Sequence, residues 1–185
     1  MIPFAKYLYL LVLFSAIHPV CAQALTAIDS LSSIEFRIRN FGMMVEGTLS
    51  GLEGTVNLDL QHPPRSQVTL SAKALTIETG ISLRDKHLQK KEYFDGDSFP
   101  YLKFVSENIS KAGGRWMITG HLHIKKTAML VSVPVTVNEE KDAWYLRGHF
   151  SINRLDFGVG PKSLALADDV AVNFVIAAKR DESQK

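Results

Sequence analysis

The feature that most constrains this chain is a two-residue alternation of apolar and polar side chains, which recurs in one segment after another. In residues 32–39, Ile34, Phe36 and Ile38 are each followed by a charged side chain. A period of two is typical of a strand with one buried face. Further strands are expected around Val56–Leu60, Val68–Ala72, Tyr101–Ser110, Arg115–Ile124, Val131–Val137, Trp144–Ile152 and Val170–Ile176.

The segments between these strands carry turn chemistry, with one exception. Lys111–Gly114 ends in two glycines and predicts a hairpin. Residues 82–91 lack β-branched side chains and suit a helix. Ser82 would cap the start of this helix, and Asp85 three residues later would complete a capping box.

Eight or nine antiparallel strands with one short helix therefore form the predicted all-β fold. Each strand has one apolar face, so the sheet must either close into a barrel or pack against a second sheet. The alternation alone is compatible with both arrangements.

The first 22 residues have the three-part pattern of a secretory signal. Lys6 supplies a positive charge, Tyr7–Ile17 is apolar and too short to span a bilayer comfortably, and small residues precede Gln23. We expect cleavage after Ala22, a single domain over residues 23–185, and a periplasmic or secreted protein that is not an integral membrane protein.

Composition excludes several kinds of site. The one cysteine of the chain is Cys21, so a chain cleaved after Ala22 would have no thiol for catalysis, for a thiolate zinc site or for an iron–sulfur cluster. The 21 basic and 19 acidic residues nearly balance, which gives no reason to expect a nucleic-acid partner.

Several short motifs together resemble the YceI-like family of exported, lipocalin-like proteins that bind polyisoprenoids. The motifs lie in the family's order and cover most of the chain: Thr79-Gly80, Arg84–Leu88, Tyr93–Asp95, Gly120–Ile124, Asn153–Val159 and Asp168–Val170. The resemblance implies an eight-stranded antiparallel barrel, closed at one end by the helical segment. It also implies a ligand inside the barrel, either a polyisoprenoid or an isoprenoid quinone.

The chain departs from the family pattern at two places. Asn40 stands where the family commonly has a histidine, and Lys125-Lys126 stand where it has Gly-Val. If the histidine holds a polar head group in the family, the identity or affinity of the ligand differs here.

The apolar residues of inward parity form the candidate binding site. On packing grounds they could simply fill the barrel, whereas the inward glycines Gly120 and Gly148 favour a hollow one with a ligand passing close to the backbone. The predicted ligand-binding residues are Ile34, Phe36, Ile38, Asn40, Phe104, Ile118, Gly120, Leu122, Val133, Val135, Phe150, Ile152 and Arg154.

Two arginines have alternative roles. Arg154 shares the inward parity of Ile152 and could pair with Asp156 or bind a polar head group. Arg84 and Asp85 could act on a head group, or could hold the helix to the barrel rim.

No catalytic signature is present, and the expected protein is a lipid binder without a cofactor rather than an enzyme. His121, His123 and His149 have outward parity, which favours a solvated face over a metal site. An enzyme that modifies such a lipid at the barrel mouth, and an interaction module with no ligand, are the alternatives. A homodimer is a possible assembly.

Overall fold

The computed structural model describes residues 24–180, and the predicted signal peptide, residues 1–22, lies outside this range. In chain order the elements are β1 (Ala24–Ala27), η1 (Asp29–Leu31), β2 (Ser33–Asn40), β3 (Met43–Leu49), β4 (Glu53–Asn57), η2 (Pro63–Arg65), β5 (Gln67–Lys73), η3 (Ala74–Thr76), α1 (Ser82–Leu88), β6 (Tyr101–Ala112), β7 (Arg115–Ile124), β8 (Thr127–Glu140), β9 (Ala143–Asn153) and β10 (Leu166–Arg180). None of the helices in this range is long and apolar enough to cross a bilayer.

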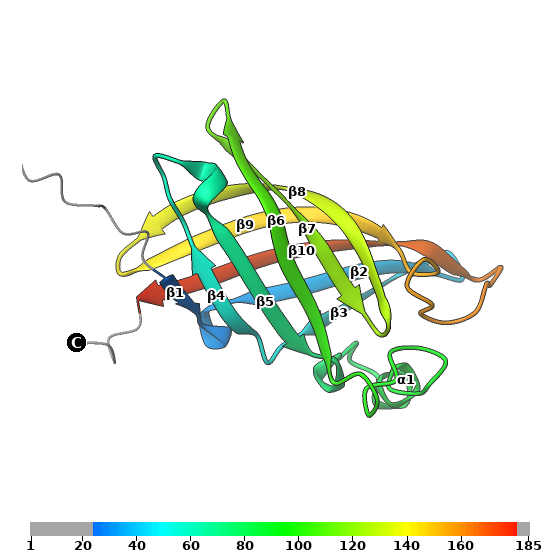
Figure 1. The fold of residues 1–185 in the computed structure, drawn as a ribbon. Coiled ribbons are helices and arrows are strands. Elements are labelled where there is room, and N and C mark those ends of the chain that lie inside the picture. Colours follow the sequence, from blue (N-terminus) through cyan, green and yellow to red (C-terminus); the bar gives the residue numbers. More distant parts are fainter. Residues whose placement is uncertain (1–23, 181–185) are drawn as a thin grey trace, which may run out of the picture.

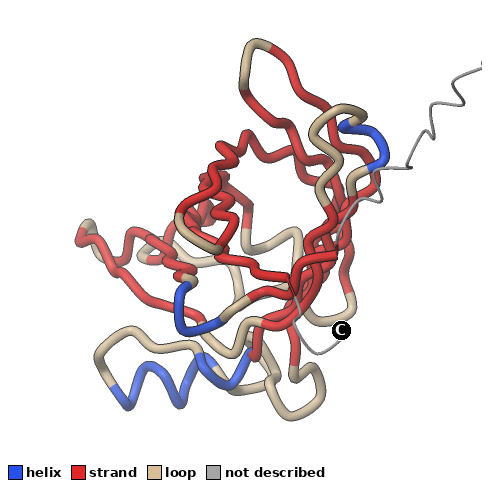
Figure 2. The backbone as a smooth tube through the Cα atoms, turned by 90° about the vertical axis from the view of Figure 1, so that its left-hand side faces the viewer, coloured by secondary structure: helices blue, strands red, loops and turns tan. Residues whose placement is uncertain are grey.

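The strand segments form one antiparallel sheet that closes on itself. Both β1 and β2 pair with β10, while β4 pairs with β1 and β3 pairs with β2. Segments β1 and β2 therefore form one interrupted strand, and β3 and β4 form a second. Together with β5 to β10 they make a barrel of eight strands. Figure 2, seen from the side of the chain termini, shows these strands as a ring. The predicted eight-stranded barrel with one short helix is confirmed, and the alternative of two packed sheets is wrong.

The connections between strands alternate between two ends because neighbouring strands run in opposite directions. At the helix end lie the connections 41–42, 74–100, 125–126 and 154–165, and α1 belongs to the second of these (Figure 1). At the hairpin end lie 58–66, 113–114 and 141–142, together with the described chain termini. The long connections are concentrated at the helix end, except for the one between β4 and β5.

Most of the predicted strands and the hairpin are present. Gly113 and Gly114, with φ of 56° and 78°, form the two-residue turn between β6 and β7. The predicted strand over Val56–Leu60 is wrong at its end, because β4 stops at Asn57. The strands β1 and β3 were not predicted, because β1 has four residues and β3 does not alternate cleanly.

The predicted capping box is wrong, although α1 lies within the predicted helical segment. Ile81 occupies the N-cap position, and no side chain caps the helix. Asp85 instead turns back to Thr79, which donates to the Asp85 Oδ1 from its backbone N at 2.8 Å and from its hydroxyl at 2.5 Å. The start of α1 is thus fixed by the loop before it.

The two ends of the barrel differ in how they are filled. The main hydrophobic cluster occupies the hairpin end, where Val56 and Ile109 are completely buried and Trp116 is 2% exposed. A smaller cluster of Ile124 and Phe157 with Val159 lies at the helix end. The space between these clusters contains a cavity.

Candidate functional site: an apolar cavity inside the barrel

The cavity has a volume of about 780 Å³ and opens at the helix end. Five side chains of the main cluster, each at most 4% exposed, bound its inner end: Val68, Ile118, Val135, Leu146 and Ile176. Near α1 and the β2–β3 turn, the lining includes Leu83 and Phe41, both largely exposed to solvent. We call this opening the mouth. The barrel is therefore hollow, and its hollow part is closed at the hairpin end.

The alternation in the sequence located the cavity wall well. Twelve of the thirteen predicted binding residues line the cavity: Ile34, Phe36, Ile38, Asn40, Phe104, Ile118, Leu122, Val133, Val135, Phe150, Ile152 and Arg154. The lining also contains residues of the helix-end connections, such as Thr79 and His87, which no strand pattern could have assigned to a barrel interior.

Gly120 is the exception, and the prediction that a ligand passes close to its backbone is wrong. It does not line the cavity, and a Cβ at this position would lie 2.7 Å from the Ser106 Cα and even closer to the carbonyl of Val105. The register between β6 and β7 shifts between Ser106 and Asn108, which brings the β6 backbone over Gly120. The glycine makes room for a strand, and not for a ligand.

Three phenylalanine rings of the wall lie over glycines. An added Cβ at any of these glycines would collide with the ring, as at Gly148, where it would lie 2.6 Å from the Phe174 Cζ. The pairs are Phe36 over Gly47, Phe104 over Gly120 and Phe174 over Gly148. Because glycine has no side chain, each ring can lie against the wall, which leaves the axis of the barrel open.

Polar side chains enter the lining only towards the helix end. They include Asn40 on β2, which is half-buried at the position where a family histidine was expected. The others are Ser71, Thr79, Arg84, His87, Tyr93, Lys103, Arg154, Lys162 and Ser163. A ligand with one polar end would therefore place that end near the mouth.

Arg84 is held beside the mouth by Thr79. Its Nε donates to the Thr79 hydroxyl at 2.6 Å, and its Nη2 donates to the Thr79 carbonyl at 2.8 Å. Within residues 24–180, Nη1 makes no protein hydrogen bond, and Arg84 is among the residues that line the cavity. Arg84 thus ties α1 to the loop before it, whereas the predicted structural role was to hold the helix to the barrel rim.

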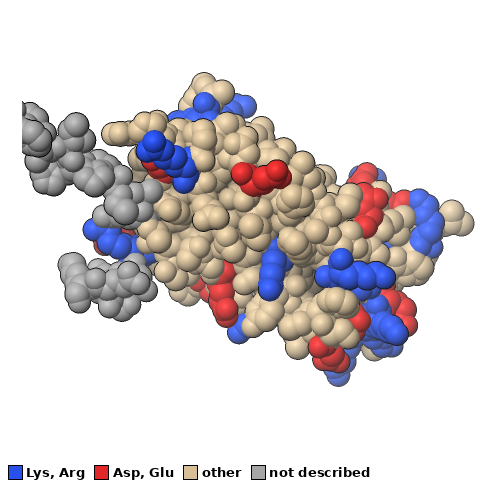
Figure 3. Space-filling view, viewed as in Figure 1, with Lys and Arg blue, Asp and Glu red and all other residues tan. Residues whose placement is uncertain are grey.

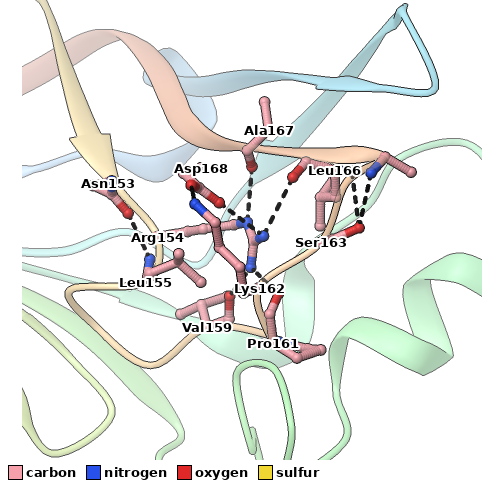
Figure 4. Close-up of polar contacts among 11 residues, drawn as sticks. Asn153, Arg154, Leu155, Val159, Pro161, Lys162, Ser163, Leu166, Ala167 and Asp168 are labelled. Carbon is pink, nitrogen blue, oxygen red and sulfur yellow. Dashed lines mark hydrogen bonds and ion pairs between the residues drawn. The ribbon is translucent and has the colours of Figure 1, made fainter.

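Arg154 is a structural residue, as Figure 4 shows. It is 3% exposed, and its predicted pairing with Asp156 is wrong, because Asp156 is exposed and forms neither an ion pair nor a hydrogen bond with the Arg154 side chain. Nε, Nη1 and Nη2 together donate to the carbonyls of Ala167 (2.8 Å), Val159 (2.9 Å), Pro161 (2.9 Å) and Leu166 (3.4 Å) and to the Asp168 carboxylate (3.3 Å). These contacts use all five donors of a guanidinium group. The residue fastens the loop between β9 and β10.

Lys125 has a comparable role at the turn between β7 and β8. Its φ is +54°, a left-handed conformation that glycine adopts without strain, at the position where the resemblance leads one to expect glycine. Its Nζ donates to the carbonyls of Lys91 and Gly158, each at 3.0 Å. The lysine therefore joins two loops of the helix end.

The outward histidines of β7 lie on the outer wall. The His121 Nδ1 is 3.8 Å from a carboxylate oxygen of Glu107, and the rings of His121 and His123 are 6.4 Å apart. In the part of the chain that the structure describes, no three His, Cys, Asp or Glu side chains are grouped so as to hold a metal ion.

Comparison with known proteins places this geometry in one family. The model of the YceI-like domain matches residues 26–178. A UPF0312 protein of Photorhabdus laumondii is 32% identical over 145 residues, which cover 70% of this chain and 73% of that protein. Protein YceI of Salmonella arizonae is 30% identical over 105 residues, which cover 56% of this chain and 53% of that protein.

Two solved structures have a similar fold. The crystal structure of BcnA from Burkholderia cenocepacia has a TM-score of 0.78 at 25% identity, covering 83% of this chain and 99% of that one. A polyisoprenoid binding domain from Saccharophagus degradans, implicated in plant cell wall breakdown, has a TM-score of 0.69 at 12% identity, covering 86% of this chain and 99% of that one.

Proposed function

The chain belongs to the YceI-like family, and on this premise we propose that its barrel binds, and carries, a long apolar lipid of the isoprenoid type. The observation that carries the proposal is the cavity of about 780 Å³, which is apolar throughout its inner part and open at one end. Such a cavity binds by removing apolar surface from water, at about 25 cal/mol per Å². The fold shared with a polyisoprenoid binding domain supports the same class of ligand.

The lining defines the direction in which the lipid enters. Val68, Ile118 and Ile176 at the inner end offer no hydrogen bond, whereas Arg84 and His87 lie at the mouth. An unpaired polar group in an apolar interior costs roughly 1–3 kcal/mol or more. The hydrocarbon chain therefore enters first, and the head group stays at the mouth.

The volume also bounds the length of chain that fits. The cavity of about 780 Å³ is closed at its inner end, so only part of a long chain fits inside it. Affinity should rise with isoprenoid length until the chain reaches the mouth and then level off, because the remaining carbons would extend beyond the mouth.

We propose binding rather than catalysis as the function, in the periplasm or outside the cell. Arg154, the most deeply buried polar side chain of the lining, uses all its donors in hydrogen bonds to the protein. Arg84 uses two of its donors in this way. The signal-like residues 1–22 support export. N-terminal sequencing of exported protein should begin at Gln23.

The test blocks the cavity and measures the lipid that remains bound. In β8, Val133 faces the cavity and is 4% exposed, while its neighbour Ser132 faces solvent. Native mass spectrometry of the purified protein should detect an isoprenoid lipid, and Val133→Trp should reduce its occupancy at least tenfold, whereas Ser132→Trp should retain it.

Circular dichroism and thermal unfolding show whether both variants are folded. If Val133→Trp does not fold, titration of the unchanged protein with an isoprenoid quinone decides the question, because a barrel that binds such lipids must saturate near one molecule per chain. Retention of lipid by a folded Val133→Trp variant, or no saturation, would contradict the proposal.

A further inference from the structure

Large apolar side chains stand in solvent around the mouth. They come from the β2–β3 hairpin, from the start of α1 and from the loop before β10. We call this set the rim: Phe41 (78% exposed), Met43 (70%), Ile81 (53%), Leu83 (80%) and Leu164 (fully exposed). Exposed apolar side chains that gather at one opening, rather than lying singly over the surface, mark an interaction site.

Phe41 is exposed at a cost in backbone energy. It has φ of +50°, and with Gly42 at +77° it forms the two-residue turn that joins β2 to β3. Asn-Gly is the favoured pair in such a turn, and a left-handed conformation costs a bulky L-residue roughly 1–2 kcal/mol. Nothing in the packing of the barrel requires an aromatic ring here, since the ring is mostly in water. Strain of this kind is typical of functional positions.

The rim and the cavity form one continuous apolar surface. Phe41, Ile81 and Leu83 belong to both, since each is exposed and each lines the cavity. Leu164 lies between two residues of the lining, and the Phe41 backbone N donates to the carbonyl of Ala165 at 2.9 Å. A molecule that leaves the cavity therefore passes over the rim.

Each of the three segments also carries a cation within three residues of its most exposed apolar side chain. The pairs are Arg39 with Phe41, Lys86 with Leu83 and Lys162 with Leu164. Figure 3 shows charges of both signs gathered at the helix end. Several carboxylates on these elements are engaged, since Glu46 pairs with Arg37, Asp85 accepts from Thr79, and Asp168 pairs with Arg154 and Lys162. Asp156 and Asp169, in the described part of the chain, form no ion pair. Within residues 24–180, Arg39 and Lys86 form no ion pair.

We propose that the rim docks on the surface of a phospholipid bilayer that contains anionic lipid. The apolar side chains enter the boundary between head groups and acyl chains, and Arg39 and Lys86 lie at the level of the phosphates. The mouth then faces the acyl chains, so a lipid can pass between bilayer and cavity without crossing water. This inference adds a binding surface to the proposed function and does not depend on which lipid the cavity takes.

The first experiment asks whether the mouth itself meets the bilayer. Phe41→Trp places a fluorophore in the rim, and Leu60→Trp, at an exposed position of the hairpin end, is the matched control. Vesicles of phosphatidylcholine and phosphatidylglycerol with brominated acyl chains are added, without any isoprenoid lipid. The emission of Phe41→Trp should shift to shorter wavelength and be quenched, and that of Leu60→Trp should not change beyond the background of Trp116 and Trp144.

The second experiment removes the rim. The triple variant Phe41→Asn, Leu83→Gln, Leu164→Ser should sediment with these vesicles at least tenfold less than the unchanged chain, because each lost side chain gives up apolar burial. Leu60→Gln with Met117→Gln, two exposed apolar positions away from the mouth, should bind as before. Phosphatidylcholine alone should bind more weakly than the mixture.

Three outcomes would overturn the proposal. The first is a Phe41→Trp spectrum that vesicles leave unchanged, even if the protein sediments with them through its N-terminus. The second is equal vesicle binding by the triple variant. The third is self-association that the triple variant abolishes while vesicle binding is absent, since the rim would then face a second copy of the chain. Failure of the lipid-retention test above affects none of these readouts, so the two proposals fail separately.

Discussion

At the hairpin end, Val56 and Ile109 are fully buried and side chains meet across the barrel axis. At the helix end, side chains line a cavity beside a smaller cluster of Ile124, Phe157 and Val159. There the loops are fastened by cations that donate to backbone carbonyls, chiefly Arg154 and Lys125. The same alternating strands run through both ends.

The difference shows how a barrel can be hollow and still have a defined structure. A cavity forfeits the apolar contacts that would otherwise stabilise the loops around it. Hydrogen bonds from a charged donor to several carbonyls replace them, because such bonds are directional and strong in a poorly solvated site. The hairpin end therefore supplies stability through packing, and the helix end holds its shape through polar contacts.

The largest effect is expected at Arg154. Arg154→Met keeps much of the apolar stem but leaves four carbonyls without their side-chain donor and leaves the Asp168 carboxylate with Lys162 alone. The free energy of unfolding in urea should fall by about 3–5 kcal/mol. Binding of an isoprenoid quinone and of a bare hydrocarbon of equal length should weaken equally. Loss of quinone binding alone, with stability unchanged, would show that Arg154 serves the head group instead.

The second prediction compares an isoleucine of the hairpin end with an isoleucine of the cavity wall. Ile109→Ala removes packed side-chain volume at the hairpin end and should cost about 3 kcal/mol. Ile38 lines the cavity and is half-buried, so Ile38→Ala should cost only about 1–2 kcal/mol. Urea unfolding of both variants measures the difference. Equal losses would mean that the cavity wall is packed as tightly as the hairpin end.

The glycines of the wall give a smaller effect. In Gly148→Ala, the new Cβ meets the Phe174 ring, which can swing into the cavity, and lies 2.9 Å from the Pro134 carbonyl oxygen. The loss should be roughly 1–2 kcal/mol, with less lipid retained. Gly120→Ala meets the β6 backbone, which cannot move as easily, and should cost more. Thermal unfolding with lipid quantification separates the two, and a milder effect at Gly120 would contradict this account.

The smallest expected effect concerns Asp59 at the hairpin end. Backbone N–H groups of His62 and Gln61 donate to its carboxylate at 2.7 and 3.0 Å and, led by His62, hold its pKa below the usual value. The stability from these bonds is present above the unfolded pKa of about 3.9 and is lost as pH falls through the lower folded pKa. The stability of Asp59→Asn relative to the unchanged chain should therefore be constant near neutral pH and rise below about pH 4. A difference independent of pH would contradict the assignment.

The alternation in the sequence predicted most of the strands and nearly all of the cavity wall, because parity alone decides which side of a strand a residue faces. It could not decide whether the interior was filled, since Phe36 and Phe174 have the same parity whether their rings cross the axis or lie over a glycine. That distinction depends on cross-strand register, which alternation does not contain.

The polar contacts of the helix end were the least predictable part. Asp156 is two residues from Arg154, but the true partner, Asp168, lies in the next strand. Ser82 and Asp85 likewise have the spacing of a capping box, but they do not form one in the structure. The Asp85 carboxylate instead accepts a hydrogen bond from Thr79. Local spacing cannot show which of several acceptors or donors the tertiary fold brings closer.

The closure of the barrel has a consequence for folding kinetics. Leu25 in the first strand pairs with Arg180 in the last, so the ring is completed only when residues from opposite ends of the chain meet. Contacts of such long sequence separation raise the contact order and slow the folding of β proteins. Until β10 docks, the edges of β9 and of the first strands remain unpaired and open to association with other chains. The final strand thus determines when the barrel forms and when its exposure to aggregation ends.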